Sequence, residues 1–237
     1  MLAVYKRELQ GYFFSPIAYI FIAIFIALAG VVFTGSNSVR GSADYNSMLY
    51  NLTFLFFIVV PVLTMRLLSE ERKNKTDQLL LTAPVSLTSM VLGKYFAALT
   101  VFLITLVITL MYPIILAMFG NPSVSEIFTG YIGFFLLGAA LIAFGVFVSA
   151  LAENQVTSAI ITFGVLFLLY ISSALLIDLI PVQWIKNVLS WLDVYSKFDS
   201  FSTGLLSITQ IVYYISFSVV FIFLTVRKIE SRRWSEV

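Results

Sequence analysis

The residues best suited to do chemistry lie in one short stretch, "LLSEERKNKTDQLLLTAPVSL", at residues 67–87. It is the densest cluster of charge in the 237-residue chain, and apolar runs long enough for a lipid bilayer lie on both sides of it. The chain contains neither cysteine nor histidine. This excludes disulfides, Cys/His zinc sites, Ser-His or Cys-His nucleophile pairs and haem ligation by either residue. The sequence therefore predicts no catalytic residue and no metal site.

One short segment resembles a phosphate-binding loop, "TSMVLGKY" at residues 88–95. The pattern G-x-x-x-x-G-K-[ST] requires glycine at position 88 and serine or threonine at position 95. Thr88 and Tyr95 stand there instead, so the match fails at both ends. We expect no nucleotide site in this chain and no enzymatic activity of its own, and any ATP and magnesium would be bound by a separate subunit.

The charged stretch has the residues of a short helix with a defined end. Ser69 is a candidate N-cap, with Glu70 and Glu71 in the first turn, where negative charge favours the helix dipole. Glu71 and Lys75 have the spacing of a helical ion pair. Thr76 is a second candidate cap before Asp77, and the leucines Leu79, Leu80 and Leu81 precede a stop at Pro84. The alternative is a plain solvated loop.

The elements around this stretch are membrane spans. Hydrophobic residues make up 60% of the chain and charged residues 11%, and the mean hydropathy is +1.01, values typical of an integral membrane protein. A spanning helix needs about 20 apolar residues. Six segments qualify, which predicts one all-α, six-span domain over 1–237, with spans near 17–35, 48–66, 95–118, 130–151, 156–177 and 209–227.

Charge at the span ends sets the orientation. With six spans and both termini inside, eleven basic residues lie on the cytoplasmic side and three, Arg40, Lys186 and Lys197, lie outside. This positive-inside bias predicts cytoplasmic termini and a cytoplasmic segment at 67–94. Charged residues are absent from the middle of the spans, which disfavours an ion-coupled carrier. The first span follows Lys6 and Arg7 like a signal peptide, but its length favours a retained helix.

Three further segments have a predicted role. Residues 1–15 are amphipathic, with Glu8 on the polar face, and predict a helix on the inner membrane surface. The outer segment 178–208 carries Trp184 and Trp191 and predicts interfacial or re-entrant helices, with a plain loop as the alternative. The fourth span places Gly138, Gly145 and Ser149 on one face, which favours close helix packing within the chain over a dimer seam.

Four segments, in this order, resemble one family. They are "KRELQGYFFSPIAYI" at 6–20, "EERKNKTDQLLLTAPVS" at 70–86 followed by Gly93-Lys94, "WLDVYSKFDSFSTGLLSI" at 191–208 and "SFSVVFIFLTVRKIESRRW" at 216–234. Together they resemble exporter-type ABC transporter permeases, the type-2 permease superfamily. Within it, the chain is most similar to gliding-motility-like and copper-processing-like bacterial permeases.

The resemblance implies a bacterial inner-membrane permease that pairs with a second permease, a copy or a paralogue, and with a dimer of cytosolic ATPases. Its substrate path would run between the two permeases, lined by the second and fifth spans, with the outer segment closing the exit. It places ATPase docking at the coupling segment 67–94 and implies no nucleic-acid partner. The implied docking residues are Glu70, Glu71, Thr76, Asp77, Leu79, Leu80 and Pro84, with Glu8 on the adjoining surface helix.

Three functions follow from this sequence. The favoured one is an exporter permease driven by a separate ATPase. The second is an ABC-linked membrane scaffold, or a component that transmits force to a partner without transport. The third is an ion-coupled carrier, which the absence of charge from the middle of the spans disfavours.

Overall fold

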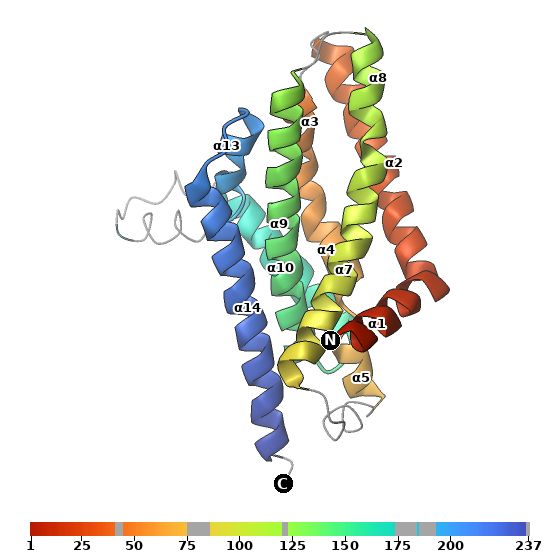
Figure 1. Cartoon of the computed structure of the whole chain (residues 1–237), viewed down its shortest axis with the longest axis vertical. Helices are drawn as coiled ribbons and strands as arrows, with labels where there is room; N and C mark the ends of the chain where they lie inside the picture. Colours follow the sequence, from red (N-terminus) through yellow and green to blue (C-terminus); the bar gives the residue numbers. More distant parts are fainter. Residues whose placement is uncertain (41–44, 75–85, 120–122, 174–183, 185–192, 236–237) are drawn as a thin grey trace.

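The computed structural model describes residues 1–40, 45–74, 86–119, 123–173, 184 and 193–235. Throughout these residues the chain is helical, with turns and short connections and without strands. Figure 1 shows long helices running side by side, with α1 lying obliquely across one end of the bundle. We call this end, where α5 and the C-terminus also lie, the α1 end; α8 reaches the opposite one.

The chain passes through the bundle in a simple order. The elements before the charged stretch are α1 (Leu2–Phe14), α2 (Pro16–Arg40), α3 (Tyr45–Leu52), a 3₁₀ turn (Thr53–Leu55), α4 (Phe56–Thr64) and α5 (Ser69–Lys73). Those after it are α7 (Leu87–Thr109), α8 (Met111–Phe119), α9 (Val124–Leu151), α10 (Gln155–Ile171), a 3₁₀ turn (Ser196–Phe198), α13 (Asp199–Ser202) and α14 (Ile208–Ser235).

The predicted all-α membrane class is confirmed. Among the described residues, five helical stretches are long and apolar enough to cross a bilayer: Pro16–Gly35, Met48–Lys73, Leu87–Met118, Val124–Leu151 and Ile208–Arg232. The apolar helix α10 has 17 residues, and the predicted fifth span runs beyond it to residues 174–177, outside the described residues. The count of six spans stays a prediction.

Helix α9 is the centre of the bundle, where it packs against α14, α4, α10 and α7. Its small residues let these neighbours approach closely. Gly138 lies against the rings of Phe102 and Phe56, and Gly145 lies against Thr64. Phe56 also packs on Phe134, with ring centroids 4.7 Å apart. The core is thus built from aromatic side chains of α4 and α7 set against glycines and rings of α9.

Helix α1 is anchored to the bundle along α7 and α2. Gly93 of α7 makes the close approach possible, because a Cβ atom there would lie 3.1 Å from the Val4 side chain. Tyr12 of α1 is buried, whereas Leu2 and Phe14 are 72% and 88% exposed. One face of α1 therefore joins the bundle, while apolar side chains at both of its ends remain uncovered.

The outer segment is described only in part. Asp193 is buried and accepts hydrogen bonds from the backbone N–H groups of Tyr195 and Ser196, which starts the 3₁₀ turn before α13. Trp184 is 70% exposed. Trp191 and the other residues of 178–192 lie outside the described part of the chain, so the predicted interfacial helices there stay a prediction.

Candidate functional site

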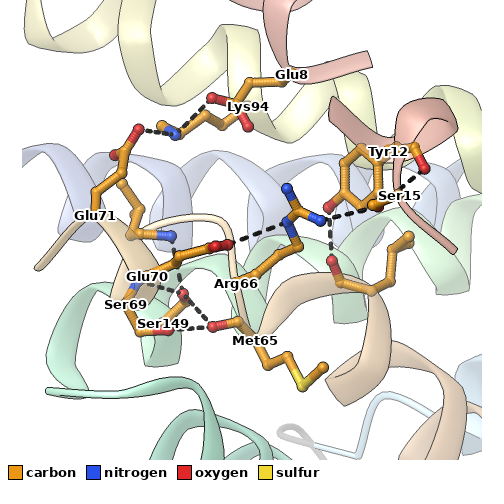
Figure 2. Close-up of polar contacts among 12 residues, drawn as sticks. Glu8, Tyr12, Ser15, Met65, Arg66, Ser69, Glu70, Glu71, Lys94 and Ser149 are labelled. Atoms are coloured by element: carbon orange, nitrogen blue, oxygen red, sulfur yellow. Dashed lines mark hydrogen bonds and ion pairs between the residues drawn. The ribbon is translucent and has the colours of Figure 1, made fainter. Parts of the chain in front are cut away.

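A cluster of polar side chains lies at the α1 end of the bundle, where α1, α5 and α7 meet (Figure 2). Its centre is Lys94, whose side chain is only 1% exposed. The Lys94 Nζ atom donates to Glu8 Oε1 of α1 at 2.8 Å and to Glu71 Oε1 of α5 at 2.7 Å. We call these three residues the Lys94 triad; it joins three helices that are far apart in the sequence.

The Lys94 triad exists because an isolated charge cannot be buried cheaply. Lys94 lies in the second turn of α7, among apolar residues, and its ammonium group needs partners there. The two carboxylates are themselves mostly covered, at 16% and 14% exposed. One cation and two carboxylates leave an excess negative charge, and the basic side chains of Arg7 and Arg66 lie around the same cavity.

A second ionic group lies beside the triad and is centred on Arg66, in the turn after α4. Its guanidinium donates to Ser15 Oγ at 3.0 Å and lies 3.3 Å from a carboxylate oxygen of Glu70. It also lies over the Tyr12 ring, 5.7 Å from the centroid. The Tyr12 hydroxyl in turn donates to the Leu63 carbonyl at 2.6 Å. These contacts fasten the junction of α1 and α2 to the end of α4.

The Tyr12 hydroxyl acts as a hydrogen-bond donor in this group. Burial raises the pKa of the Tyr12 phenol, and the nearby Glu8 charge adds to this effect, whereas Arg66 opposes it. The phenol therefore stays protonated at neutral pH, so its bond to the Leu63 carbonyl is maintained.

Ser149 connects this region to the end of the central helix α9. Its hydroxyl oxygen accepts from the backbone N–H groups of Leu68 and Ser69 at 3.1 and 3.2 Å, and it donates to the Met65 carbonyl at 3.3 Å. The predicted N-cap role of Ser69 is wrong: Leu68 occupies the cap position, and Ser69 is the first, buried residue of α5. Its hydroxyl donates back to the Met65 carbonyl.

Arg72 of α5 forms a further connection to α9. One nitrogen of its guanidinium donates to the carbonyls of Leu151 and Ala152, at 3.1 and 3.2 Å, and the other lies 3.4 Å from Glu153. Cationic side chains suit this position because the last carbonyls of a helix lack partners within it. Helix α5 is therefore fixed to α7 by Glu71 and to α9 by Arg72.

The clustered side chains surround a polar cavity of about 280 Å³ between α1, α5 and α7. Glu8, Glu70 and Glu71 line it together with Arg7, Arg66 and Lys94. Among the described residues, no group of three or more His, Cys, Asp or Glu side chains could hold a metal ion. What this arrangement can do is fix the relative positions of helices: a displacement of α5 is passed to α1 and α7 through ion pairs.

The structure brings only some of the predicted site residues together. Glu8, Glu70 and Glu71 line one cavity, and Ser149 holds the start of α5. Gly138 and Gly145 lie deeper in the bundle, against Phe102 and Thr64. The remaining predicted docking residues lie outside the described part of the chain, as does Lys75, the expected partner of Glu71. They are Thr76, Asp77, Leu79, Leu80 and Pro84.

Three residues of the site were not singled out from the sequence: Lys94, Arg66 and Tyr12. Lys94 was considered only as part of a failed phosphate loop. A usable signal was present, because a lysine two turns inside an apolar helix requires a counter-ion. Nothing in the sequence indicated that Glu8, 86 residues away, would provide one.

Comparison with known proteins gives one match. A family model described as ABC-2 family transporter protein matches residues 31–227. The matched part runs from α2 into α14 and includes Glu71 and Lys94, whereas α1 and Glu8 precede it. No curated protein matches the chain.

Proposed function

The chain belongs to the ABC-2 family of transporter proteins, which makes it a membrane subunit of an ABC transporter, and from this premise we propose that it is the permease of an exporter. In this proposal the substrate moves outward across the bacterial inner membrane. The energy comes from ATP hydrolysed by a dimer of separate cytosolic subunits. A second permease, a copy or a paralogue, completes the translocation path.

The chemistry of the α1 end supports a separate source of energy. Gly93 and Lys94 lie within the continuous helix α7, not in a loop that could wrap a phosphate. Gly93 lies against Val4, and the Lys94 ammonium is held by two carboxylates. A group committed in this way is not free to bind the phosphates of ATP.

The Lys94 triad is the observation that carries the proposal. We propose that the ATPase docks on the coupling segment 67–94, through Glu70, Glu71, Thr76, Asp77, Leu79, Leu80 and Pro84. The docked segment continues directly from α5, which the triad and Arg72 bind to α7, α1 and the end of α9. Closure of the ATPase dimer on ATP would pull α5, and the buried ion pairs would transmit that movement to the spans.

The same proposal places both termini and the α1 end in the cytoplasm, as the distribution of basic residues favours. Helix α1 then lies at the inner membrane surface, with Glu8 directed into the bundle toward Lys94. The outer segment, with Trp184 and Trp191, closes the exit. The similarity to gliding-motility-like and copper-processing-like permeases guides the choice of the first substrates to assay.

Co-purification of the ATPase tests this proposal. The full chain is co-expressed with the phosphate-loop protein encoded beside it, either unchanged or with Leu79→Asp and Leu80→Asp together. We expect the unchanged chain to retain the ATPase and the double variant to lose it. Leu205→Asp with Leu206→Asp is the matched control, because these two leucines, 65% and 53% exposed, lie beyond α13. Undiminished retention by the Leu79/Leu80 variant would overturn the docking proposal.

A further inference from the structure

A second surface of the molecule has the features of a ligand site, separate from the Lys94 triad. A groove of about 620 Å³ runs between the start of α7 and the last turns of α14. We propose that this groove binds an anionic phospholipid, with an acyl chain along its apolar walls and the phosphate at Arg227. This inference does not depend on the proposed ATPase docking.

The walls of the groove are apolar and open. Leu87 and Leu92 of α7 face Val219, Ile222, Phe223 and Val226 of α14 across it. Val219 and Phe223 remain 59% and 53% exposed. Apolar surface of this kind gains from contact with an acyl chain, and a small free anion would gain nothing from it.

The depth of the groove matches the position of a lipid. Residues 208–226 of α14 contain no charged side chain, and a helix of this length covers roughly the 30 Å of a bilayer's hydrocarbon core. Arg227 is the first charged residue after this stretch. It lies where the hydrocarbon ends and the lipid headgroups begin, while the apolar walls lie at the depth of the acyl chains.

The polar end of the groove provides a positively charged donor. The Arg227 guanidinium lies over the Phe223 ring, 5.2 Å from its centroid, and both side chains line the groove. One of its nitrogens lies 2.7 Å from Glu230. Guanidinium has five N–H donors, so this single ion pair leaves others for a phosphate. Thr88 adds a hydroxyl group at the same end.

Charge complementarity selects an anionic lipid over a neutral one. The end of α14 reads "RKIESRRW", with four basic residues and one acid over residues 227–234. Basic residues next to the end of a span attract anionic headgroups, and basic pockets between spans bind them. Because Glu230 neutralises only part of this charge, a zwitterionic headgroup gains less at this site than an anionic one.

Native mass spectrometry of the full chain in detergent tests the proposal. Three probes are titrated: phosphatidylglycerol, phosphatidylcholine with the same chains, and glycerol phosphate, which has the anion without the chains. We expect discrete adducts of phosphatidylglycerol, weaker binding of phosphatidylcholine and none of glycerol phosphate. Equal binding of the two lipids, or an adduct with glycerol phosphate, would overturn the proposal.

Two pairs of variants locate the site. Arg227→Gln and Glu230→Gln both break the same ion pair, but only the first removes the cation. We expect phosphatidylglycerol binding to weaken about tenfold in Arg227→Gln, as for the loss of a hydrogen-bonded charged partner, and to be unchanged or tighter in Glu230→Gln. Equal losses in both variants would show that the ion pair matters only for structure, and would contradict the assignment.

Val219→Trp fills the groove, whereas Val220→Trp adds the same bulk at a neighbouring residue, 51% exposed, that does not line it. We expect only Val219→Trp to reduce the adducts. The same spectra report oligomeric mass. If Val219→Trp changed the oligomer and left lipid adducts intact, the groove would be a protein interface and the lipid assignment would be wrong.

Discussion

At the scale of single residues, Lys94 determines how the α1 end is built. A lysine with 1% exposure is stable only with its partners in place, since breaking a buried ion pair leaves an uncompensated charge. Glu8 and Glu71 satisfy that requirement from two other helices. The cost of separating them gives the contact between α1, α5 and α7 its rigidity.

Lys94→Met should destabilise the protein strongly. It leaves two buried carboxylates without their cation, for which we expect a loss of about 3–5 kcal/mol in the free energy of unfolding. Unfolding of the purified chain in detergent measures this loss. Arg72→Met is the matched control, because its partner Glu153 is 81% exposed and an exposed pair contributes about 1 kcal/mol or less.

The triple variant Lys94→Met, Glu8→Gln and Glu71→Gln separates charge from packing. With both carboxylates neutralised, we expect it to regain much of the stability lost in Lys94→Met, because replacing a whole buried ionic group is far less costly than breaking it. If the triple variant were no more stable than Lys94→Met, the Lys94 triad would not be an electrostatic unit.

Glu71→Gln should uncouple the permease from its ATPase. The amide keeps the shape of the side chain but loses the charge that holds α5 to Lys94. We expect the ATPase to co-purify normally, while the permease no longer changes the rate of ATP hydrolysis in reconstituted vesicles. Glu153→Gln serves as the control because Glu153 is exposed. A normal response from Glu71→Gln would contradict the proposed route of transmission.

At the scale of helices, the glycines of α9 set how closely its neighbours pack. A methyl group at Gly138 would overlap the Phe102 ring, whereas one at Gly164 of α10 meets no atom within 4 Å. We expect Gly138→Ala to cost about 1–3 kcal/mol by overpacking. Gly164→Ala should be neutral or gain up to about 1 kcal/mol from helix propensity. Unfolding curves for the two variants make the comparison, and equal values would contradict this packing.

Ser149 performs a different task at the end of the same helix. Ser149→Ala would remove the acceptor of two backbone N–H groups at the start of α5, and unsatisfied buried donors destabilise by about 1–3 kcal/mol. We expect a comparable loss in the free energy of unfolding, together with faster amide hydrogen exchange in α5. Ser202→Ala, which removes only a local bond on α13, should change neither measurement.

At the scale of the whole molecule, the proposed orientation can be measured directly because the chain has no cysteine. Single cysteines at two exposed positions, Asn74→Cys and Thr203→Cys, report on opposite sides of the membrane. We expect an impermeant maleimide to label Thr203→Cys in intact cells and Asn74→Cys only after permeabilisation. The reverse pattern would place the α1 end outside and exclude docking of a cytosolic ATPase there.

The sequence by itself determined the class of this protein. Composition and long apolar runs are properties of consecutive residues, so the all-α membrane class and five of the spans followed from hydropathy. The order of the charged motifs indicated the permease family, which the match over 31–227 confirmed. These conclusions hold because helix formation in a bilayer is dictated locally: every backbone group must be satisfied within its own segment.

Only the tertiary structure decided how the charged residues are paired. Local spacing predicted Glu71 with Lys75 and Ser69 as a cap, whereas Glu71 meets Lys94 and Ser69 is buried against Met65 and Ser149. Helical spacing accounts for pairs three or four residues apart, but Glu8 and Lys94 are separated by 86 residues. Such pairs form because packing buries a charge or a backbone group, and the nearest chemically suitable side chain then satisfies it, wherever it lies in the sequence.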